Sequence, residues 1–438
     1  MPSISEAVYL GVIGKPILQS LSPVIHEAAL EQLGLVGAYL RLAVDSVSEA
    51  LTCSREMGLK GINVTAPFKS EVLTEIRGLD NEVMETSAAN TIVFGQSVSA
   101  FNTDIYGIRQ SLGLVSKRAD GKTALIIGAG GAARAAVVAL KQVGCKVFIC
   151  NRTAEKATDL AVSLGVNQVD FRGVEVLLKE LDYLVNTVPA TDQLIDLRNL
   201  QNRTRILDAI YAKETFFSKR CSSNPKYVNG RIWLLNQGLK AFELFTGVKL
   251  TDAQILAVGN RFTTATRLFP NTISLIGMMG VGKSSVGKSL GSIMNSDVVD
   301  LDSVVEQKAG CSIAKLVTEQ GETVFRKIES ECLASVLEKR PRVLSCGAGV
   351  IGSESNRALL MSQTTPVWLW ASKAELVERL ANSTSRPLLQ GHDLTTRINE
   401  LMEQRFIHYA KVSELVVSTT MKTPVNIAKR IAFEFSNV

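Results

Sequence analysis

Two glycine-rich loops constrain the fold of this chain more than any other feature. The first, residues 128–135, reads Gly-Ala-Gly-Gly-Ala-Ala-Arg-Ala, and the second, residues 277–284, reads Gly-Met-Met-Gly-Val-Gly-Lys-Ser. Each loop follows a short apolar run typical of a strand and precedes a segment with helical character. A strand, a glycine turn and a helix together predict a phosphate site, because glycines let a phosphate approach the backbone and the helix N-terminus offers free N–H groups.

Strand-like runs alternate with helical segments along the whole chain, which predicts parallel α/β domains. Around the two loops the predicted strands are Ala124–Ile127 and Ile273–Ile276, and the predicted helices are Ala133–Val143 and Ser285–Met294. A domain boundary is expected at residues 268–271, because Pro270 cannot continue a helix and precedes the strand of the second loop. No short-period repeat or low-complexity segment interrupts the pattern.

The composition excludes several classes of protein. Of the 438 residues 46% are hydrophobic and 21% charged, which excludes wholesale disorder. The 48 Lys and Arg against 42 Asp and Glu give +6 without a basic stripe, which suits small anionic ligands better than nucleic acid. Seven scattered cysteines without a CxxC pair favour a reducing compartment and argue against a zinc site. We therefore expect a cytoplasmic protein with no membrane segment.

The first loop is predicted to bind NADP. A predicted strand, Lys146–Cys150, ends at Asn151, which stands 23 residues after Gly128. NAD enzymes place an acidic residue there for the ribose 2′-hydroxyl, whereas Arg152 would favour a 2′-phosphate. The candidate residues for NADPH or NADP are Gly128, Gly130, Gly131, Ala132, Asn151, Arg152 and Thr153.

Four polar motifs occur in order in the first half of the chain. They are the serine pair Ser20 and Ser22, Asn-Val-Thr-Ala-Pro-Phe-Lys at 63–69, Ala-Asn-Thr at 89–91, and Asn-Thr-Asp at 102–104. Taken singly such clusters are turn sequences. Together they make residues 8–262 resemble shikimate dehydrogenase.

This resemblance implies a site for a small hydroxy acid. It makes Lys69 the catalytic lysine and Asp104 its partner, a pair able to move a proton without a metal. It also implies the substrate contacts Ser20 and Ser22 for the carboxylate, Thr65 and Asn90 for ring hydroxyls, and Tyr211 and Gln237 late in the domain. The chain departs from the family pattern at Asn186–Ala190, near the expected nicotinamide.

The second loop satisfies the pattern G-x-x-x-x-G-K-[ST], which predicts ATP binding. Lys283 would reach the β- and γ-phosphates and Ser284 would bind magnesium. The predicted nucleotide residues are Gly280, Gly282, Lys283, Ser284 and Ser285. Further along, Val299–Asp302 alternates so that Asp300 and Asp302 are expected on one side of a strand end.

Later motifs make residues 272–435 similar to shikimate kinase. They lie at 320–329, 346–350, 385–389 and 404–409. The resemblance implies that Asp300 supports magnesium and Asp302 holds the 3-hydroxyl as base. It further implies a carboxylate clamp of Arg326 and Arg405, an acceptor turn at Gly347 and Gly349, and Arg386 in a lid over the nucleotide. Ala348 stands where the family has the middle glycine of three.

We therefore expect a bifunctional enzyme of the shikimate pathway that uses NADPH, ATP and magnesium. Residues 1–268 would form the dehydrogenase, with a substrate lobe of about 1–105 plus 237–268 and a Rossmann-type NADP lobe of about 106–236. Residues 271–438 would form the P-loop kinase. Two alternatives remain: a non-catalytic sensor of shikimate or quinate, and a quinate/shikimate dehydrogenase fused to a kinase of another small hydroxy acid.

Overall fold

The computed structural model describes residues 7–190, 195–211, 214–266, 269–381 and 393–437. The chain forms two compact units, each built from segments that are distant in the sequence. The first unit takes Met1–Pro23, Gly34–Ile62 and Thr266–Val438, and the second takes Val24–Leu33 and Asn63–Ala265. Strands alternate with helices and pair mostly in parallel, so the predicted α/β class is confirmed.

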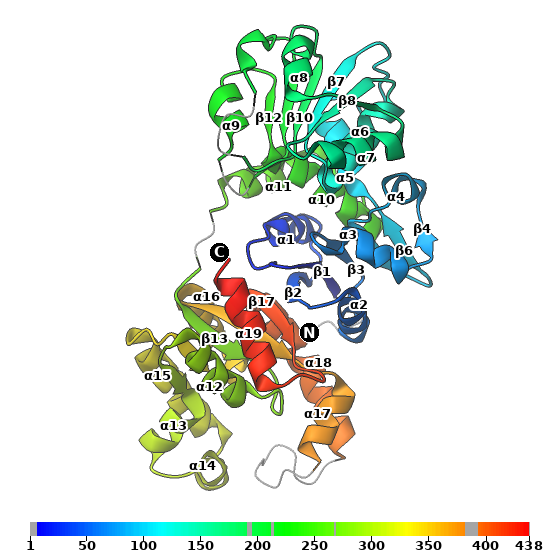
Figure 1. Ribbon diagram of the computed structural model, residues 1–438. Coiled ribbons are helices and arrows are strands. Elements are labelled where there is room, and N and C mark those ends of the chain that lie inside the picture. The colour runs from blue at the N-terminus through cyan, green and yellow to red at the C-terminus, as the bar shows by residue number, and fades with distance from the viewer. Residues whose placement is uncertain (1–6, 191–194, 212–213, 267–268, 382–392, 438) are drawn as a thin grey trace. The chain divides into compact units, whose positions relative to one another are not determined.

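A parallel sheet forms the core of the first unit. In spatial order its strands are β14 (Val298–Asp300), β15 (Val343–Ser345), β13 (Thr272–Ile276), β16 (Thr364–Trp370), β17 (Leu415–Ser418), β2 (Gly37–Ala43) and β1 (Val8–Gly14). The helices of this unit are α2 (Val47–Glu56), α12 (Lys283–Met294), α13 (Leu301–Ala309), α14 (Ile313–Gln320), α15 (Glu322–Glu338), α16 (Glu354–Gln363), α17 (Lys373–Leu380), α18 (Leu394–Val412) and α19 (Pro424–Phe435). Figure 1 shows α19 packed over β17.

One strand pairing in this sheet joins the N-terminal and C-terminal segments of the chain. β17 pairs in parallel with β2, so that Val416 lies opposite Leu42 and Val417 opposite Ala43. An edge strand exposes unpaired N–H and C=O groups, and this pairing covers the C-terminal end of the outer edge of β2. The C-terminal segment therefore continues the sheet begun by the N-terminal segment.

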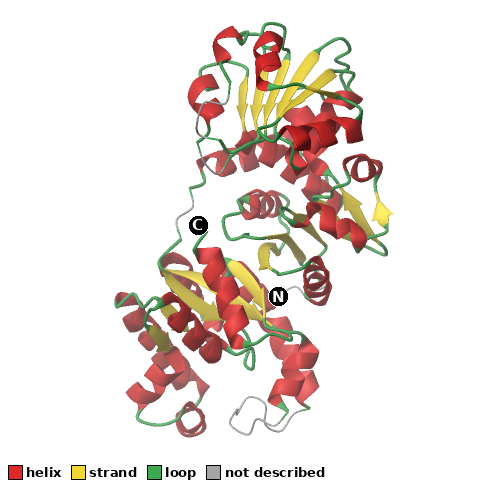
Figure 2. Cartoon of the chain, viewed as in Figure 1, coloured by secondary structure: helices red, strands yellow, loops and turns green. Residues whose placement is uncertain are grey.

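A six-stranded parallel sheet organises the second unit, with helices packed against it (Figure 2). Its order is β12 (Tyr227–Asn229), β11 (Arg205–Asp208), β10 (Tyr183–Asn186), β7 (Thr123–Ile127), β8 (Lys146–Cys150) and β9 (Asn167–Gln168). The unit also contains β5 (Thr91–Phe94), β6 (Val98–Phe101), β4 (Gly78–Leu79), α3 (Phe68–Glu71), α4 (Asn81–Thr86), α5 (Thr103–Ser111), α6 (Gly131–Gln142), α7 (Ala154–Leu164), α8 (Phe171–Leu177), α9 (Phe216–Cys221), α10 (Gly230–Thr246) and α11 (Asp252–Thr264). The helix α1 (Ser22–Gln32) and the strand β3 (Gly61–Val64) carry the chain between the units.

The predicted local elements need small corrections. The strand predicted at Lys146–Cys150 is confirmed as β8. The two loop helices begin earlier than predicted, at Gly131 and Lys283, because Gly130 and Gly282 of the loops themselves serve as N-caps. None of the described helices is long and apolar enough to cross a membrane.

His26 on α1 is fully buried beside Phe242 and Phe245, with ring centroids 6.0 and 5.8 Å away. Burial lowers the pKa of His26 to about 3, although a hydrogen bond with Asn63 opposes the shift. The unfolded chain binds this proton with an ordinary pKa of about 6.5. The fold therefore loses stability as the pH falls from about 6.5 toward 3, by up to about 1.4 kcal/mol per pH unit.

We expect a His26→Phe variant to lose this pH dependence. Its free energy of unfolding in urea should fall less than that of the wild type between pH 6.5 and 4.5. Measurements at pH 7.5 to 8.5, where the imidazole is neutral in both states, provide the control. Equal slopes for the two proteins between pH 6.5 and 4.5 would contradict the assignment.

Candidate functional sites

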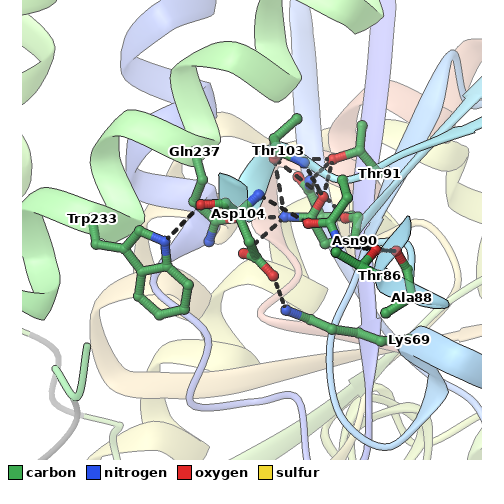
Figure 3. A network of polar contacts seen from close by, with 11 residues as sticks. Lys69, Thr86, Ala88, Asn90, Thr91, Thr103, Asp104, Trp233 and Gln237 are labelled. Atoms are coloured by element: carbon green, nitrogen blue, oxygen red, sulfur yellow. Dashed lines mark hydrogen bonds and ion pairs between the residues drawn. The ribbon is translucent and has the colours of Figure 1, made fainter. Parts of the chain in front are cut away.

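A lysine–aspartate ion pair belongs to a network of polar contacts in the second unit (Figure 3). Lys69 follows the turn of the 63–69 motif on α3, and its Nζ lies 2.5 Å from Asp104 Oδ2. The side chain of Asp104 is 1% exposed and that of Lys69 is 19% exposed. The carboxylate is thus shielded from water while the ammonium group remains accessible to a ligand.

Asp104 is fixed from several directions. Its second carboxylate oxygen, Oδ1, accepts a hydrogen bond of 3.0 Å from Asn90 Nδ2, and its backbone N–H donates to Asn102, the N-cap of α5, at 3.2 Å. From α10, the indole of Trp233 donates to the Asp104 carbonyl at 3.3 Å. A carboxylate held this way sets the position of the Lys69 ammonium.

Asn90 connects the ion pair to Gln237. Its amide nitrogen lies 3.0 Å from Thr103 Oγ1 and 2.6 Å from Gln237 Oε1, in addition to the contact with Asp104. An amide nitrogen has only two hydrogens for these three acceptors. One acceptor is therefore able to take a hydrogen bond from a ligand hydroxyl instead.

The other predicted substrate residues lie in both units. Burial raises the pKa of the Tyr211 phenol, and the charge of Asp104 adds to the shift, so Tyr211 remains a hydroxyl donor near the ion pair. Thr65 is half-buried four residues before Lys69. Ser20 and Ser22 belong to the first unit, where Ser22 begins α1 and its N–H donates to Ser20 Oγ at 3.3 Å.

The first glycine loop opens into a pocket of about 460 Å³. Gly128 has φ +121°, and a Cβ there would overlap Thr187 Oγ1, so only glycine fits. A Cβ on Gly130 would meet nothing within 4 Å, and no side chain caps α6, which leaves free N–H groups for a phosphate. A Cβ on Gly131 would lie 3.8 Å from Lys69 Cδ, so the loop reaches the ion pair.

The predicted 2′-phosphate residues line this pocket. They are Asn151, Arg152 and Thr153. Lys156 on α7 lines it as well and was missed by the sequence analysis, although its position one turn after Thr153 points to the same side. The segment Asn186–Ala190, which departs from the family pattern, also lines the pocket, through Val188, Pro189 and Ala190. Its first residue, Asn186, is buried and donates a hydrogen bond to Asp208 at 2.8 Å.

The second loop has the shape of a phosphate cradle in the first unit. Gly280 and Gly282 have φ +84° and +88°, and a Cβ on Gly282 would meet nothing within 4 Å. Lys283 Nζ donates to the carbonyls of Gly277 and Met278, each at 3.0 Å. These backbone contacts hold the ammonium over the loop.

Ser284 and Asp300 lie together as predicted for a magnesium site. Ser284 Oγ donates to Asp300 Oδ2 at 2.6 Å, which places two oxygen ligands side by side. The strand alternation predicted for Asp300 and Asp302 is wrong. β14 ends at Asp300, whose carboxylate accepts from Ser303 N–H and caps α13, so Asp302 lies in the first turn of a helix.

A second pocket, of about 470 Å³, lies next to the cradle. It is lined by Asp302, Arg326, Glu329, Gly347, Ala348, Gly349 and Arg405 among others. Arg326 Nη1 donates to Glu329 Oε2 at 2.8 Å. Glu329 is 1% exposed, and desolvation raises the pKa of its carboxyl although Arg326 pulls the other way. Glu329 therefore fixes the guanidinium that faces the pocket.

The turn at 347–349 leaves no room for side chains at its two ends. A Cβ on Gly347 would lie 2.6 Å from Glu329 Oε1 and 2.7 Å from Asp302 Oδ1, and one on Gly349 would overlap the Arg326 guanidinium. The middle residue, Ala348, carries its methyl group, and its carbonyl accepts from Tyr409 Oη at 2.6 Å. The departure from the triple glycine therefore places an alanine in the lining of the pocket.

Glu329 lines this pocket and Tyr409 donates to its turn, and neither is among the predicted site residues. They stand three and four residues after Arg326 and Arg405 on their helices, a spacing that places them on the same faces. Arg405 Nη1 also lies 3.4 Å from the Ala348 carbonyl, while Ser285 is exposed in the first turn of α12. Arg386 lies outside the described residues.

Two family models match the first part of the chain. One, described as shikimate dehydrogenase substrate binding domain, covers residues 12–92, and the other, described as shikimate / quinate 5-dehydrogenase, covers residues 113–210. A shikimate dehydrogenase (NADP(+)) of Archaeoglobus fulgidus is 36% identical over 256 residues, which are 55% of this chain and 94% of that relative. The chain belongs to the shikimate dehydrogenase family. A third family model, described as shikimate kinase, matches residues 279–435.

Solved structures support the dehydrogenase assignment. The shikimate dehydrogenase of Aquifex aeolicus has a TM-score of 0.54 and 31% identity, covering 60% of this chain and 99% of its own. The Thermus thermophilus enzyme, solved with NADP(H) and shikimate, has a TM-score of 0.52 and 28% identity, covering 58% and 99%. The chain thus combines an NADP-type shikimate dehydrogenase with a shikimate kinase domain, as predicted for a bifunctional shikimate-pathway enzyme.

We expect Arg152→Ala to weaken NADPH use selectively. Loss of the guanidinium should raise the KM of the dehydrogenase for NADPH by about 10-fold or more, because a charge-assisted contact to the 2′-phosphate is lost. The KM for NADH, which lacks that phosphate, is the internal control and should not change. Equal effects on both nucleotides, or none on NADPH, would contradict the role given to Arg152.

The acceptor turn provides a matched pair of glycine variants. Gly349→Ala should push the Arg326 guanidinium away and raise the kinase KM for shikimate by about 10-fold or more, the effect of losing a charge-assisted contact. Gly352→Ala is the control, since a Cβ there meets nothing within 4 Å. If the two variants have the same KM, the turn does not shape the acceptor pocket.

Proposed function

We propose that this chain catalyses two successive reactions: reduction of 3-dehydroshikimate to shikimate with NADPH, and phosphorylation of the shikimate 3-hydroxyl with MgATP. The observation that supports the proposal most directly is that each unit has a buried ion pair near its glycine-rich phosphate loop. Lys69 and Asp104 lie next to the dinucleotide loop, and Arg326 faces a pocket beside the P-loop. The product of the first reaction is the substrate of the second.

In the dehydrogenase, Lys69 is proposed as the proton donor. NADPH, when bound, supplies the hydride that turns the ketone carbon into a secondary alcohol carbon. The ketone oxygen then takes a proton from Lys69 Nζ, while Asp104 keeps the lysine in place. The 19% exposure of Lys69 against 1% for Asp104 supports this division of roles, because only the lysine is open to a ligand.

Hydroxyl and carboxylate contacts would orient the substrate. Ser20 and Ser22 are proposed to donate to its carboxylate, and Thr65, Tyr211 and Gln237 to contact its ring hydroxyls together with Asn90. The short Asn90–Gln237 contact supports this assignment, since both side chains keep hydrogen-bonding groups near the ion pair.

In the kinase, Asp302 is proposed to accept the proton of the shikimate 3-hydroxyl. The hydroxyl oxygen would form a bond to the γ-phosphorus of ATP while the bond from that phosphorus to the β,γ-bridging oxygen breaks and ADP leaves. Lys283 and the glycine loop would hold the phosphates and stabilise the charge on the transferred group. Ser284 and Asp300 would hold magnesium, which when bound neutralises phosphate charge. Arg326 and Arg405, which line the same pocket, would bind the carboxylate of shikimate.

We further propose the domain boundaries and setting of the enzyme. Residues 1–268 would carry the dehydrogenase and 271–438 the kinase. The partners would be small anionic metabolites rather than nucleic acid, given the nearly balanced charge. A cytoplasmic location is supported by the seven cysteines, all described and all free.

Two variants test the independence of the sites. Lys69→Ala should lower NADPH oxidation by about 100-fold or more, the scale of a lost general acid, and leave phosphorylation of added shikimate intact. Lys283→Ala should do the reverse. Each activity is the control for the other in one folded protein, measured by nicotinamide absorbance and ADP release. Loss of both activities from either single variant would refute two independent sites.

A further inference from the structure

The C-terminal helix of the kinase contacts the turn that carries the dehydrogenase serines. This turn connects β1 to α1 and includes Ser20. Glu434 on α19 accepts hydrogen bonds from the backbone N–H groups of Ile17 and Leu18, at 2.7 and 2.8 Å through one oxygen, Oε2. Glu434 is 0% exposed, and its two partners are buried as well, Ile17 at 1% and Leu18 at 0% exposure. A residue 417 positions away thus supplies the acceptor for the turn.

The carboxylate of Glu434 is itself held in place. Arg430, one turn earlier on α19, pairs with Glu434 Oε1 at 2.8 Å and is 4% exposed. The same guanidinium donates to the carbonyl of Gly14, the last residue of β1, at 3.2 Å. The helix therefore binds the turn at its start through Arg430 and at its middle through Glu434, and the buried ion pair between these two residues fixes both side chains.

A second contact fixes the serine itself. Arg41 on β2 donates through Nε and Nη2 to the Ser20 carbonyl, at 3.0 and 2.8 Å. Its third nitrogen, Nη1, donates to Glu414 of the kinase segment, at 3.3 Å to the carbonyl and 3.1 Å to Oε2. Glu414 directly precedes β17, the strand that pairs with β2. The backbone of Ser20 is thereby tied to the kinase through one buried guanidinium.

We propose that Glu434 is a positioning residue for the dehydrogenase: the kinase domain holds the carboxylate-binding turn in its active shape. The proposal rests on the proposed roles of Ser20 and Ser22. It extends them, because Glu434 is the acceptor for two N–H groups of the turn that are buried in this chain. Leaving these buried donors unsatisfied is costly, so the turn would rearrange when the carboxylate is withdrawn.

Glu434→Gln removes the charge and keeps the shape. We expect the KM for 3-dehydroshikimate to rise by about 10-fold, as for a lost charge-assisted hydrogen bond, while the dehydrogenase kcat and the kinase KM for shikimate change by less than about 2-fold. Glu338→Gln, the same substitution at an exposed position of α15, is the matched control and should change nothing. Glu434→Asp keeps the charge beside Arg430 but withdraws it from the turn, so it should raise the same KM. This second variant tests the proposal even if Glu434→Gln does not fold.

Two further measurements separate the possible failures. In the oxidation direction with NADP, shikimate methyl ester lacks the free carboxylate, so Glu434→Gln and wild type should use it equally poorly. Ser22→Ala tests the underlying role: if it leaves the KM for 3-dehydroshikimate unchanged, the proposed serine contact fails. If Ser22→Ala raises that KM but both Glu434 variants do not, the positioning role is overturned. A proportional loss of both activities, with a lower melting temperature, overturns it as well, since that is a general loss of structure.

Discussion

Buried carboxylates that hold a cation in place are the interaction on which the sites of this chain depend. Asp104 holds Lys69 in the dehydrogenase, and Glu329 holds Arg326 in the kinase pocket. Each carboxylate is 1% exposed, while its cation partner is more exposed and open to a ligand. A buried charge is tolerated only with a partner in good geometry, so the partner gains a defined position. A free lysine or arginine would lose that position to rotamer entropy.

The two phosphate loops solve a different problem, the close approach of an anion to the backbone. Gly128 and Gly282 both adopt positive φ, but a Cβ at the two positions would meet different surroundings. Gly128 faces Thr187 at the end of β10, so the sheet itself excludes a side chain, whereas Gly282 faces open space above the P-loop. Each loop contains both kinds of glycine, because Gly130 of the first loop also meets open space and a Cβ on Gly277 of the second would overlap the backbone of β16. Packing therefore fixes the course of each loop, and the open positions leave its backbone accessible to a phosphate.

Much of the chemistry was predictable because it is encoded in short stretches of sequence. The glycine loops, the strand Lys146–Cys150 and the α/β class follow from local pattern. The helical placement of Asp302 was not predicted, because a two-residue alternation in Val299–Asp302 also fits the last residues of a strand followed by a capped helix. Nothing local marks Glu434 as a neighbour of Ile17, since pairing across 417 residues depends on how β17 and β2 meet.

If one chain performs both reactions in sequence, an assay of the purified protein should show that the second depends on the first. The protein is given 3-dehydroshikimate, ATP and magnesium, and ADP release is followed before and after NADPH is added. We predict no ADP above background until NADPH arrives, then ADP and oxidised nucleotide in equal amounts, with NADH a poor substitute. Consumption of NADPH without ADP, even after shikimate is supplied, would contradict it, and so would ADP release that does not depend on NADPH.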